Sequence, residues 1–215
     1  MFTVLRNTWA LFFGFGIICL AHGLQGTLIG VRSVLEGFSY LSTGLIIAGY
    51  YVGYLSGSII IPIFLKRVGH IRVFAALASL ASIAILIHSV FLDPYSWFVI
   101  RIFTGLSLSG IYIIMESWLN DKSNNQTRGQ ILSIYMIITF IFVGLGQLLL
   151  NLSDPAKVDL FILVSILLSF ALLPILLSSS EQPNVLDIKK ISLREFYVIS
   201  PLGFVGAFFT SDSPK

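Results

Sequence analysis

Long stretches without a charged residue constrain this chain more than any other feature of its sequence. Five of them run for 20 to 29 residues without Asp, Glu, Lys or Arg: 7–31, 37–65, 73–92, 129–153 and 160–180. A helix needs roughly 20 residues to cross about 30 Å of hydrocarbon, so each run is long enough to span a membrane. A strand of a membrane barrel needs only about 10 residues and alternates apolar with polar side chains, which these runs do not. The runs therefore predict membrane-spanning helices.

The composition excludes most soluble classes of protein. Hydrophobic residues make up 56% of the chain and charged residues 11%, against roughly 45–50% and about 25% in a soluble domain. A soluble enzyme, a nucleic-acid-binding protein and a coiled coil are all disfavoured. The only cysteine, Cys19, permits neither an intramolecular disulfide nor a cysteine metal cluster, and the sequence contains no G-x-x-x-x-G-K-[ST] or H-E-x-x-H motif. We therefore expect no enzyme activity, no cofactor, no metal site and no nucleic-acid partner.

A sixth span is predicted where one arginine interrupts an apolar segment. Residues 95–118 are apolar on both sides of Arg101. The sequence thus predicts an all-α membrane protein with six spans, at 9–31, 41–65, 72–92, 95–118, 129–151 and 159–178. The run 196–211 holds only 16 uncharged residues and is interpreted as the truncated start of a seventh helix. The predicted organisation is a six-helix bundle over 1–178, a central cytoplasmic loop over 179–196 and the beginning of a second half over 197–215.

The distribution of basic residues predicts how the bundle is oriented. With a cytoplasmic N-terminus, nine Lys and Arg residues fall on the inner side of the membrane and two, Arg32 and Lys157, on the outer side. Cytoplasmic segments of membrane proteins carry such an excess of Lys and Arg. We therefore expect an integral protein of the plasma (inner) membrane, with the lipid bilayer as a partner and the N-terminus in the cytoplasm.

Several polar side chains lie where the membrane makes them costly. Arg101 near a bilayer centre costs at least about 2.5–3.5 kcal/mol, so it should face protein or water rather than lipid. Tyr112 shares its face of the helix, while His22 and Gln25 lie within one turn of the first span. We expect Arg101 and His22 to face one aqueous cavity, with Gln25 and Tyr112 in its wall. The alternatives are a structural arginine that binds backbone carbonyls and a buried histidine held by a neighbouring helix.

A stripe of glycines predicts close helix packing. Gly44, Gly49, Gly53 and Gly57 recur every four or five residues in the second span, and Gly105 lies in the fourth. Small residues at this spacing allow the backbones of two helices to approach closely. We interpret these glycines as packing residues that carry no chemistry by themselves.

Three segments of the sequence together resemble a known family. The loop after the second span reads Lys66-Arg67-Val68-Gly69-His70-Ile71-Arg72, the fourth span contains Arg101-Ile102-Phe103-Thr104-Gly105, and the stretch from Met115 to Met136 contains Glu116-Ser117-Trp118 and Thr127-Arg128-Gly129-Gln130. The first resembles the signature cytoplasmic loop of the major facilitator superfamily, and the second resembles that superfamily's fourth-helix R-x-x-x-G motif. The third is similar to the YcaD-like branch of these permeases. The resemblance covers residues from about 9 to 209.

The resemblance implies a site and a gate. It implies two six-helix halves, of which this chain contains the first and the opening of the second, and a cavity lined by the first and fourth helices. Arg101 would then bind an anionic solute group or take part in coupling. The gate would comprise Lys66, Arg67, Gly69, Arg72, Glu116, Asp121 and Arg128. Because Lys66 stands where the superfamily usually has an acidic residue, we expect Glu116 or Asp121 to supply the missing carboxylate, with Glu116 paired to Arg67, Arg72 or Arg128. His70 is expected in a solvated basic cluster.

The functional expectation is a secondary active transporter that moves a small solute by alternating access. An ion gradient or the solute's own gradient would drive it, with proton coupling as the favoured alternative. The missing C-terminal six-helix half would be its partner. The chain by itself is not expected to transport as a monomer. The alternatives are a non-transporting membrane assembly or packing protein and a homodimeric half-transporter.

Overall fold

The computed structural model of the chain describes residues 2–177, with side chains from Thr8 onward. The predicted central loop over 179–196 and the predicted start of a second half over 197–215 lie outside this range. Within it the chain forms helices joined by short connections, and no strand occurs there. The all-helical prediction is confirmed.

Within residues 2–177, six helical spans are long and apolar enough to cross a membrane. The helices are α1 (Phe2–Leu35), α2 (Tyr40–Val68), α3 (His70–Val90), α4 (Pro94–Asp121), α5 (Arg128–Leu148) with the 3-10 helix η1 (Leu149–Leu152), α6 (Asp159–Phe170) and α7 (Leu172–Leu177). The fifth span is α5 with η1, and the sixth is α6 with α7. All six predicted spans are present, most with ends that differ from the prediction by a few residues.

Identifiable residues set several helix ends. The Asp93 carboxylate accepts a hydrogen bond from the backbone N–H of Ser96 at 2.9 Å and so caps α4. The hydrogen bonds from Ser96 lower the pKa of Asp93. Pro174 has no N–H to donate to the carbonyl of Phe170, where α6 ends, and this accounts for the break between α6 and α7.

The predicted basic loop is much shorter than the sequence suggests. Helix α2 continues to Val68 and α3 begins at His70, so Gly69 alone separates them. Gly69 has φ of 91°, a conformation that favours glycine. The short connection brings the end of α2 and the start of α3 to the same end of the bundle.

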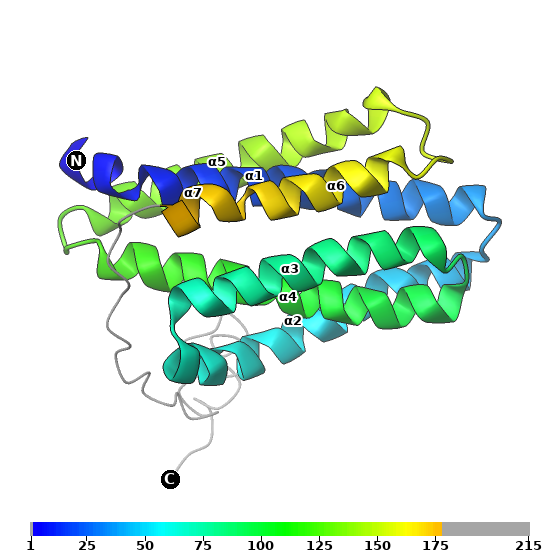
Figure 1. The fold of residues 1–215 in the computed structure, drawn as a ribbon, viewed down its shortest axis with the longest axis horizontal. Helices are drawn as coiled ribbons and strands as arrows, with labels where there is room; N and C mark the ends of the chain where they lie inside the picture. The colour runs from blue at the N-terminus through cyan, green and yellow to red at the C-terminus, as the bar shows by residue number, and fades with distance from the viewer. Residues whose placement is uncertain (1, 178–215) are drawn as a thin grey trace, which may run out of the picture. The chain divides into compact units, whose positions relative to one another are not determined.

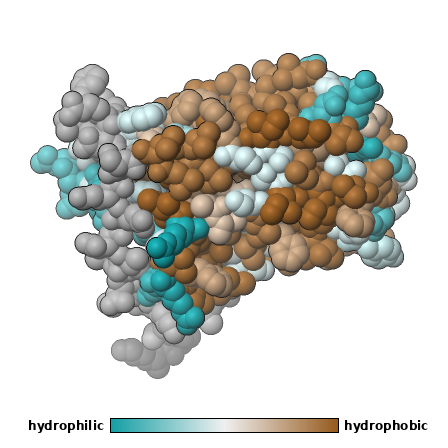
Figure 2. All heavy atoms as spheres, in the orientation of Figure 1, coloured by the Kyte–Doolittle hydropathy of each residue, from teal (hydrophilic) through white to brown (hydrophobic). Residues whose placement is uncertain are grey.

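The helices pack in a defined order (Figure 1). Helix α4 lies against α2 and α3, helix α1 lies against α5 and α6, and α3 lies against α6. The first and fourth spans are the most buried, whereas the second and fifth are the most exposed. Figure 2 shows a largely hydrophobic surface across the middle of one face, with hydrophilic residues gathered toward its ends. Such a surface suits a bundle that spans a bilayer.

Glycines bring two pairs of helices into backbone contact. A Cβ atom on Gly53 of α2 would collide with the carbonyl of Ile102 on α4, and one on Gly105 of α4 would collide with the carbonyl of Tyr50 on α2. Helices α1 and α5 repeat this arrangement, with Gly23 against Val143 and Gly146 against Leu20.

The other glycines of the α2 stripe differ in their surroundings. Cβ atoms on Gly49 and Gly57 would lie 2.8 Å from the carbonyl oxygens of Phe98 and Leu106 on α4. A Cβ atom on Gly44 would meet nothing within 4 Å. The close approach of α2 to α4 therefore depends on Gly49, Gly53, Gly57 and Gly105, and Gly44 takes no part in it.

Candidate functional site

A cavity of about 230 Å³ lies among α1, α2 and α4. Its lining consists of His22, Gln25 and Gly26 from α1, Ile47, Tyr50 and Tyr51 from α2, and Arg101 from α4. The structure thus brings together three residues that the sequence singled out: His22, Gln25 and Arg101. No carboxylate belongs to this lining, so Arg101 gives the cavity a positive character.

Arg101 is buried but has no anionic partner. Its side chain is 7% exposed, and it forms neither a hydrogen bond nor an ion pair with any residue of 2–177; its Nε atom is buried without an acceptor. The guanidinium carbon lies 4.7 Å from the centre of the Tyr50 ring. A ring face attracts a cation without neutralising its charge. Arg101 therefore keeps its hydrogen-bonding capacity available to a bound anion.

Two residues of α1 complete the polar part of the cavity. Gln25 follows His22 by three positions, which places both on one face of the helix. Gln25 is buried, and its Nε2 donor has no hydrogen-bond partner within the described part of the chain. The His22 ring lies 5.8 Å from the ring of Tyr50 and 6.3 Å from that of Tyr112, measured between centroids. Unused donors from α1 and α4 therefore belong to one cavity.

Tyr112 supports the cavity instead of lining it. It contacts the ring of His22 edge-on, but it is not among the lining residues. Its ring meets that of Phe15 at a centroid distance of 5.5 Å. The sequence placed Tyr112 in the wall, whereas the structure places it one layer behind His22.

The sequence reasoning missed the contribution of α2. The cavity is lined by Ile47, Tyr50 and Tyr51 of α2. The sequence predicted only a helix-packing role for this helix, based on its glycines. The contact between Gly105 and the Tyr50 carbonyl holds α2 close enough for the Tyr50 ring to pack on Arg101. A tyrosine pair between Gly49 and Gly53 was the available signal, but spacing alone does not reveal which helix such a pair faces.

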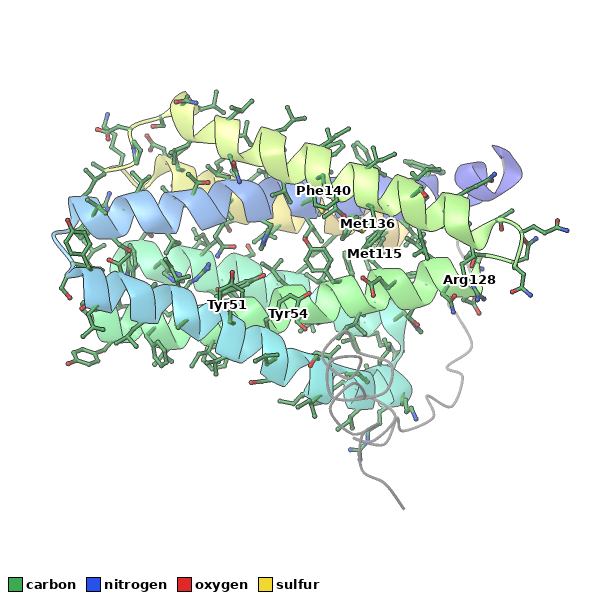
Figure 3. The ribbon with its side chains drawn as sticks, turned by 180° about the vertical axis from the view of Figure 1, so that it is seen from behind. Tyr51, Tyr54, Met115, Arg128, Met136 and Phe140 are labelled. Carbon is green, nitrogen blue, oxygen red and sulfur yellow. The ribbon has the colours of Figure 1, made fainter. Side chains whose placement is uncertain are left out.

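The end of the bundle at which α2 and α4 finish holds the predicted gate residues. Exposed side chains there are Lys66, Arg67, Arg72, Glu116, Asp121 and Arg128, and Gly69 joins α2 to α3. In Figure 3, Arg128 lies at the start of α5, beyond Met115 of α4. These residues share one end because α2 and α4 finish there and α3 and α5 begin there.

The ion pair expected for Glu116 is absent among the described residues. Its Oε1 atom instead accepts a hydrogen bond from the Tyr135 hydroxyl of α5 at 3.1 Å. No ion pair joins Glu116 to Arg67, Arg72 or Arg128. The predicted pairing is therefore wrong for this conformation: Glu116 is turned toward α5 and bonded there, while Arg72 borders a groove among α2, α3 and α4.

His70 also departs from its expected setting. It is buried, and its Nε2 atom shares a hydrogen bond with the Ser117 hydroxyl of α4 at 3.0 Å. Its ring lies 5.9 Å from that of Trp118. The expectation of a solvated histidine is wrong because α3 begins at His70 itself, so the side chain packs against the last turns of α4.

A second buried arginine lies at the opposite end of the bundle and was not predicted to matter. The Nη2 atom of Arg32 lies 2.5 Å from the Glu36 carboxylate. Its Nη1 atom donates hydrogen bonds to the backbone carbonyls of Pro155 and Ala156. Arg32 thus ties the end of α1 to the loop that precedes α6.

Comparisons with known proteins find one matching family and several relatives. A family model described as "Major Facilitator Superfamily" matches residues 11–211. The protein named "Uncharacterized MFS-type transporter YcaD" from Escherichia fergusonii is 25% identical over 171 residues, which cover 80% of this chain and 45% of that protein. Its namesake from Escherichia coli O45:K1 is 25% identical over 151 residues, or 70% of this chain and 40% of that protein. The chain spans less than half the length of these relatives.

Proposed function

The chain belongs to the Major Facilitator Superfamily, and on that premise we propose that it supplies one bundle of a secondary active transporter for a small organic anion. Its six apolar helices make it an integral membrane protein. In this proposal the bundle rocks against a second one around a central site, so that the site opens to one side of the membrane at a time.

Uncompensated Arg101 carries the proposal for an anionic solute. A buried cation without a counter-ion is costly, and a bound carboxylate would remove that cost while accepting hydrogen bonds from the guanidinium. The Gln25 amide offers a further donor, and the lining contains no acid that would attract a cation. A volume of about 230 Å³ is below the roughly 300 Å³ at which ligand pockets usually begin, which favours a small solute.

His22 is proposed as the site of proton coupling. A histidine can gain a proton near neutral pH, and this one faces Tyr50, Tyr112 and the Arg101 cavity. A proton on His22 would add a second positive charge beside the solute site. The bound anion would offset the repulsion between the two cations, so proton and anion would bind together and cross in the same direction.

The second six-helix half is proposed as the partner that covers the open side of the bundle. Figure 3 shows Tyr51 and Tyr54 along α2, across from Met136 and Phe140 of α5. Tyr51, Met136 and Phe140 are exposed, although they are large and apolar. Residues 179–196 would act as the linker to that half. The N-terminus would lie in the cytoplasm. The exposed charged residues at the same end of the bundle would then form the cytoplasmic gate.

A matched pair of probes tests the solute class. Benzoate and benzylamine have the same ring and opposite charges. Either can be added to the full-length protein after its purification from the cells that produce it. We expect benzoate and similar small carboxylates to raise the melting temperature, and Arg101→Gln to abolish that rise. Stabilisation by benzylamine but not by any carboxylate would contradict the proposal. The mass of the active species would separate a two-half transporter from a homodimer of half-transporters.

A further inference from the structure

A second hollow lies on the outside of the bundle, among α2, α3 and α4. It has a volume of about 360 Å³, and every lining residue except Arg72 is apolar. Phe64 of α2, Ala76 of α3 and Phe103 of α4 are among those residues. The groove shares no lining residue with the Arg101 cavity. It is therefore a separate site, and it does not depend on the proposed transport function.

The groove is open toward the surroundings of the bundle. Phe64 is 51% exposed and Phe103 is 48% exposed. Because the helices that form the groove span a membrane, its apolar walls face either hydrocarbon or another protein. An apolar occupant is required in either case, because the apolar side chains of the groove offer water no hydrogen-bond donor or acceptor.

The groove reaches deeper than one leaflet. The hydrogen bond between His70 and Ser117 aligns the start of α3 with the inner part of α4. Phe103 lies fourteen residues from Ser117, which corresponds to roughly 21 Å along the helix. Half of the hydrocarbon core is about 15 Å. The groove thus extends from the membrane boundary at Arg72 to beyond the middle of the bilayer.

The aliphatic stem of Arg72 borders one end of the groove. Arg72 lies in the first turn of α3, it is exposed, and it forms no ion pair with residues of 2–177. Arg67 is exposed at the nearby end of α2. An arginine fork matches the geometry of a phosphate, and basic side chains next to a membrane attract anionic headgroups.

We propose that this groove binds an anionic phospholipid. One acyl chain occupies the space among Phe64, Ala76 and Phe103, and the headgroup phosphate binds Arg72. Charge complementarity favours this occupant over a neutral lipid, because the groove ends at a cation that has no carboxylate partner in the described part of the chain. It also favours a lipid over an apolar protein helix, which would leave Arg72 without a counter-ion at the membrane boundary.

Native mass spectrometry of the protein purified from membranes tests the site with two lipids that have identical chains. Dioleoylphosphatidylglycerol is anionic, and dioleoylphosphatidylcholine is zwitterionic. We expect the anionic lipid to bind about fivefold more tightly, the effect of one basic residue at an anionic surface. Arg72→Gln should remove this preference, and Ala76→Phe should weaken the binding of both lipids by filling the groove.

Two variants serve as matched controls. Arg128→Gln removes an exposed arginine from the same end of the bundle, and Ser79→Phe adds a ring at an exposed position of α3 outside the groove. Both should bind lipid as the unmodified protein does. If Ala76→Phe fails to insert, Ala76→Leu fills part of the same space. Equal binding of the two lipids, or a preference that survives Arg72→Gln, would overturn the proposal and indicate an ordinary lipid shell or a protein occupant.

Discussion

Arg32 and Arg101 are both buried, yet their surroundings differ completely. Arg32 is 9% exposed and Arg101 is 7% exposed. Arg32 pairs with Glu36 and donates to two backbone carbonyls. Arg101 forms no such bond with residues 2–177, and its guanidinium packs on the face of the Tyr50 ring. Burial therefore does not reveal what an arginine does in a membrane bundle. The acceptors of its hydrogen bonds do reveal it. Those of Arg32 join two parts of the fold, whereas Arg101 has no acceptor among residues 2–177.

The largest effect is expected from Arg101→Gln. We expect solute uptake in cells that express the protein to fall about 100-fold, because the charge-assisted hydrogen bonds to the anion are lost. Helix content and membrane insertion should stay unchanged, since this guanidinium forms no hydrogen bond or ion pair with residues 2–177 and its contact with the Tyr50 ring is weak. Arg101→Lys keeps the charge without the fork and should retain part of the uptake. Loss of folded protein in step with uptake would make Arg101 a structural residue like Arg32.

Arg32→Ala should show the reverse pattern. The change leaves the Glu36 carboxylate without its partner and the carbonyls of Pro155 and Ala156 without their donor. We expect a loss of about 2 kcal/mol in the free energy of unfolding, measured by thermal denaturation in detergent. Solute affinity of the folded fraction should be unaffected. As a control, Lys157→Ala removes an exposed cation from the same loop and should change neither stability nor solute affinity. A loss of solute affinity in Arg32→Ala would contradict a purely structural role for Arg32.

Gly53→Ala should disturb the Arg101 region and leave the Arg32 region intact. The added methyl group collides with the Ile102 carbonyl, so α2 must move away from α4. Overpacking of this kind costs about 1–3 kcal/mol, and the displaced Tyr50 should also weaken solute binding. Gly44→Ala is the matched control, because a Cβ atom there meets open space. If both variants have the same melting temperature, the α2–α4 contact does not depend on glycine.

The smallest effect is expected from Tyr50→Leu. The leucine keeps an apolar contact with Arg101 but removes the ring face that attracts the guanidinium. Such an interaction contributes about 0.5–2 kcal/mol. We therefore expect solute affinity to fall by about fivefold, with the Arg32 region unaffected. Isothermal titration of purified protein would measure it. An unchanged affinity would show that the ring only fills space.

The six spans were predictable because hydrophobic length alone specifies them. Their spacing likewise placed His22 and Gln25 within one turn of α1. The partners of these side chains were not predictable, since spacing along one helix does not say which helix lies opposite. This is why Tyr50 was missed and why Glu116, expected to pair with an arginine, is bonded to Tyr135. Arg32 was overlooked for a related reason: its carbonyl partners lie more than a hundred residues away in sequence.

Tyr50 takes part in two contacts through different atoms. Its backbone carbonyl lies against Gly105, and its ring lies under Arg101. Any shift of α2 along α4 therefore changes the electrostatic environment of the guanidinium. By thermodynamic reciprocity, an anion that binds better when the ring is in place must also favour the helix register that puts it there, by the same factor. The register of α2 against α4 and the occupancy of the Arg101 cavity are then coupled, so a change in one must change the other.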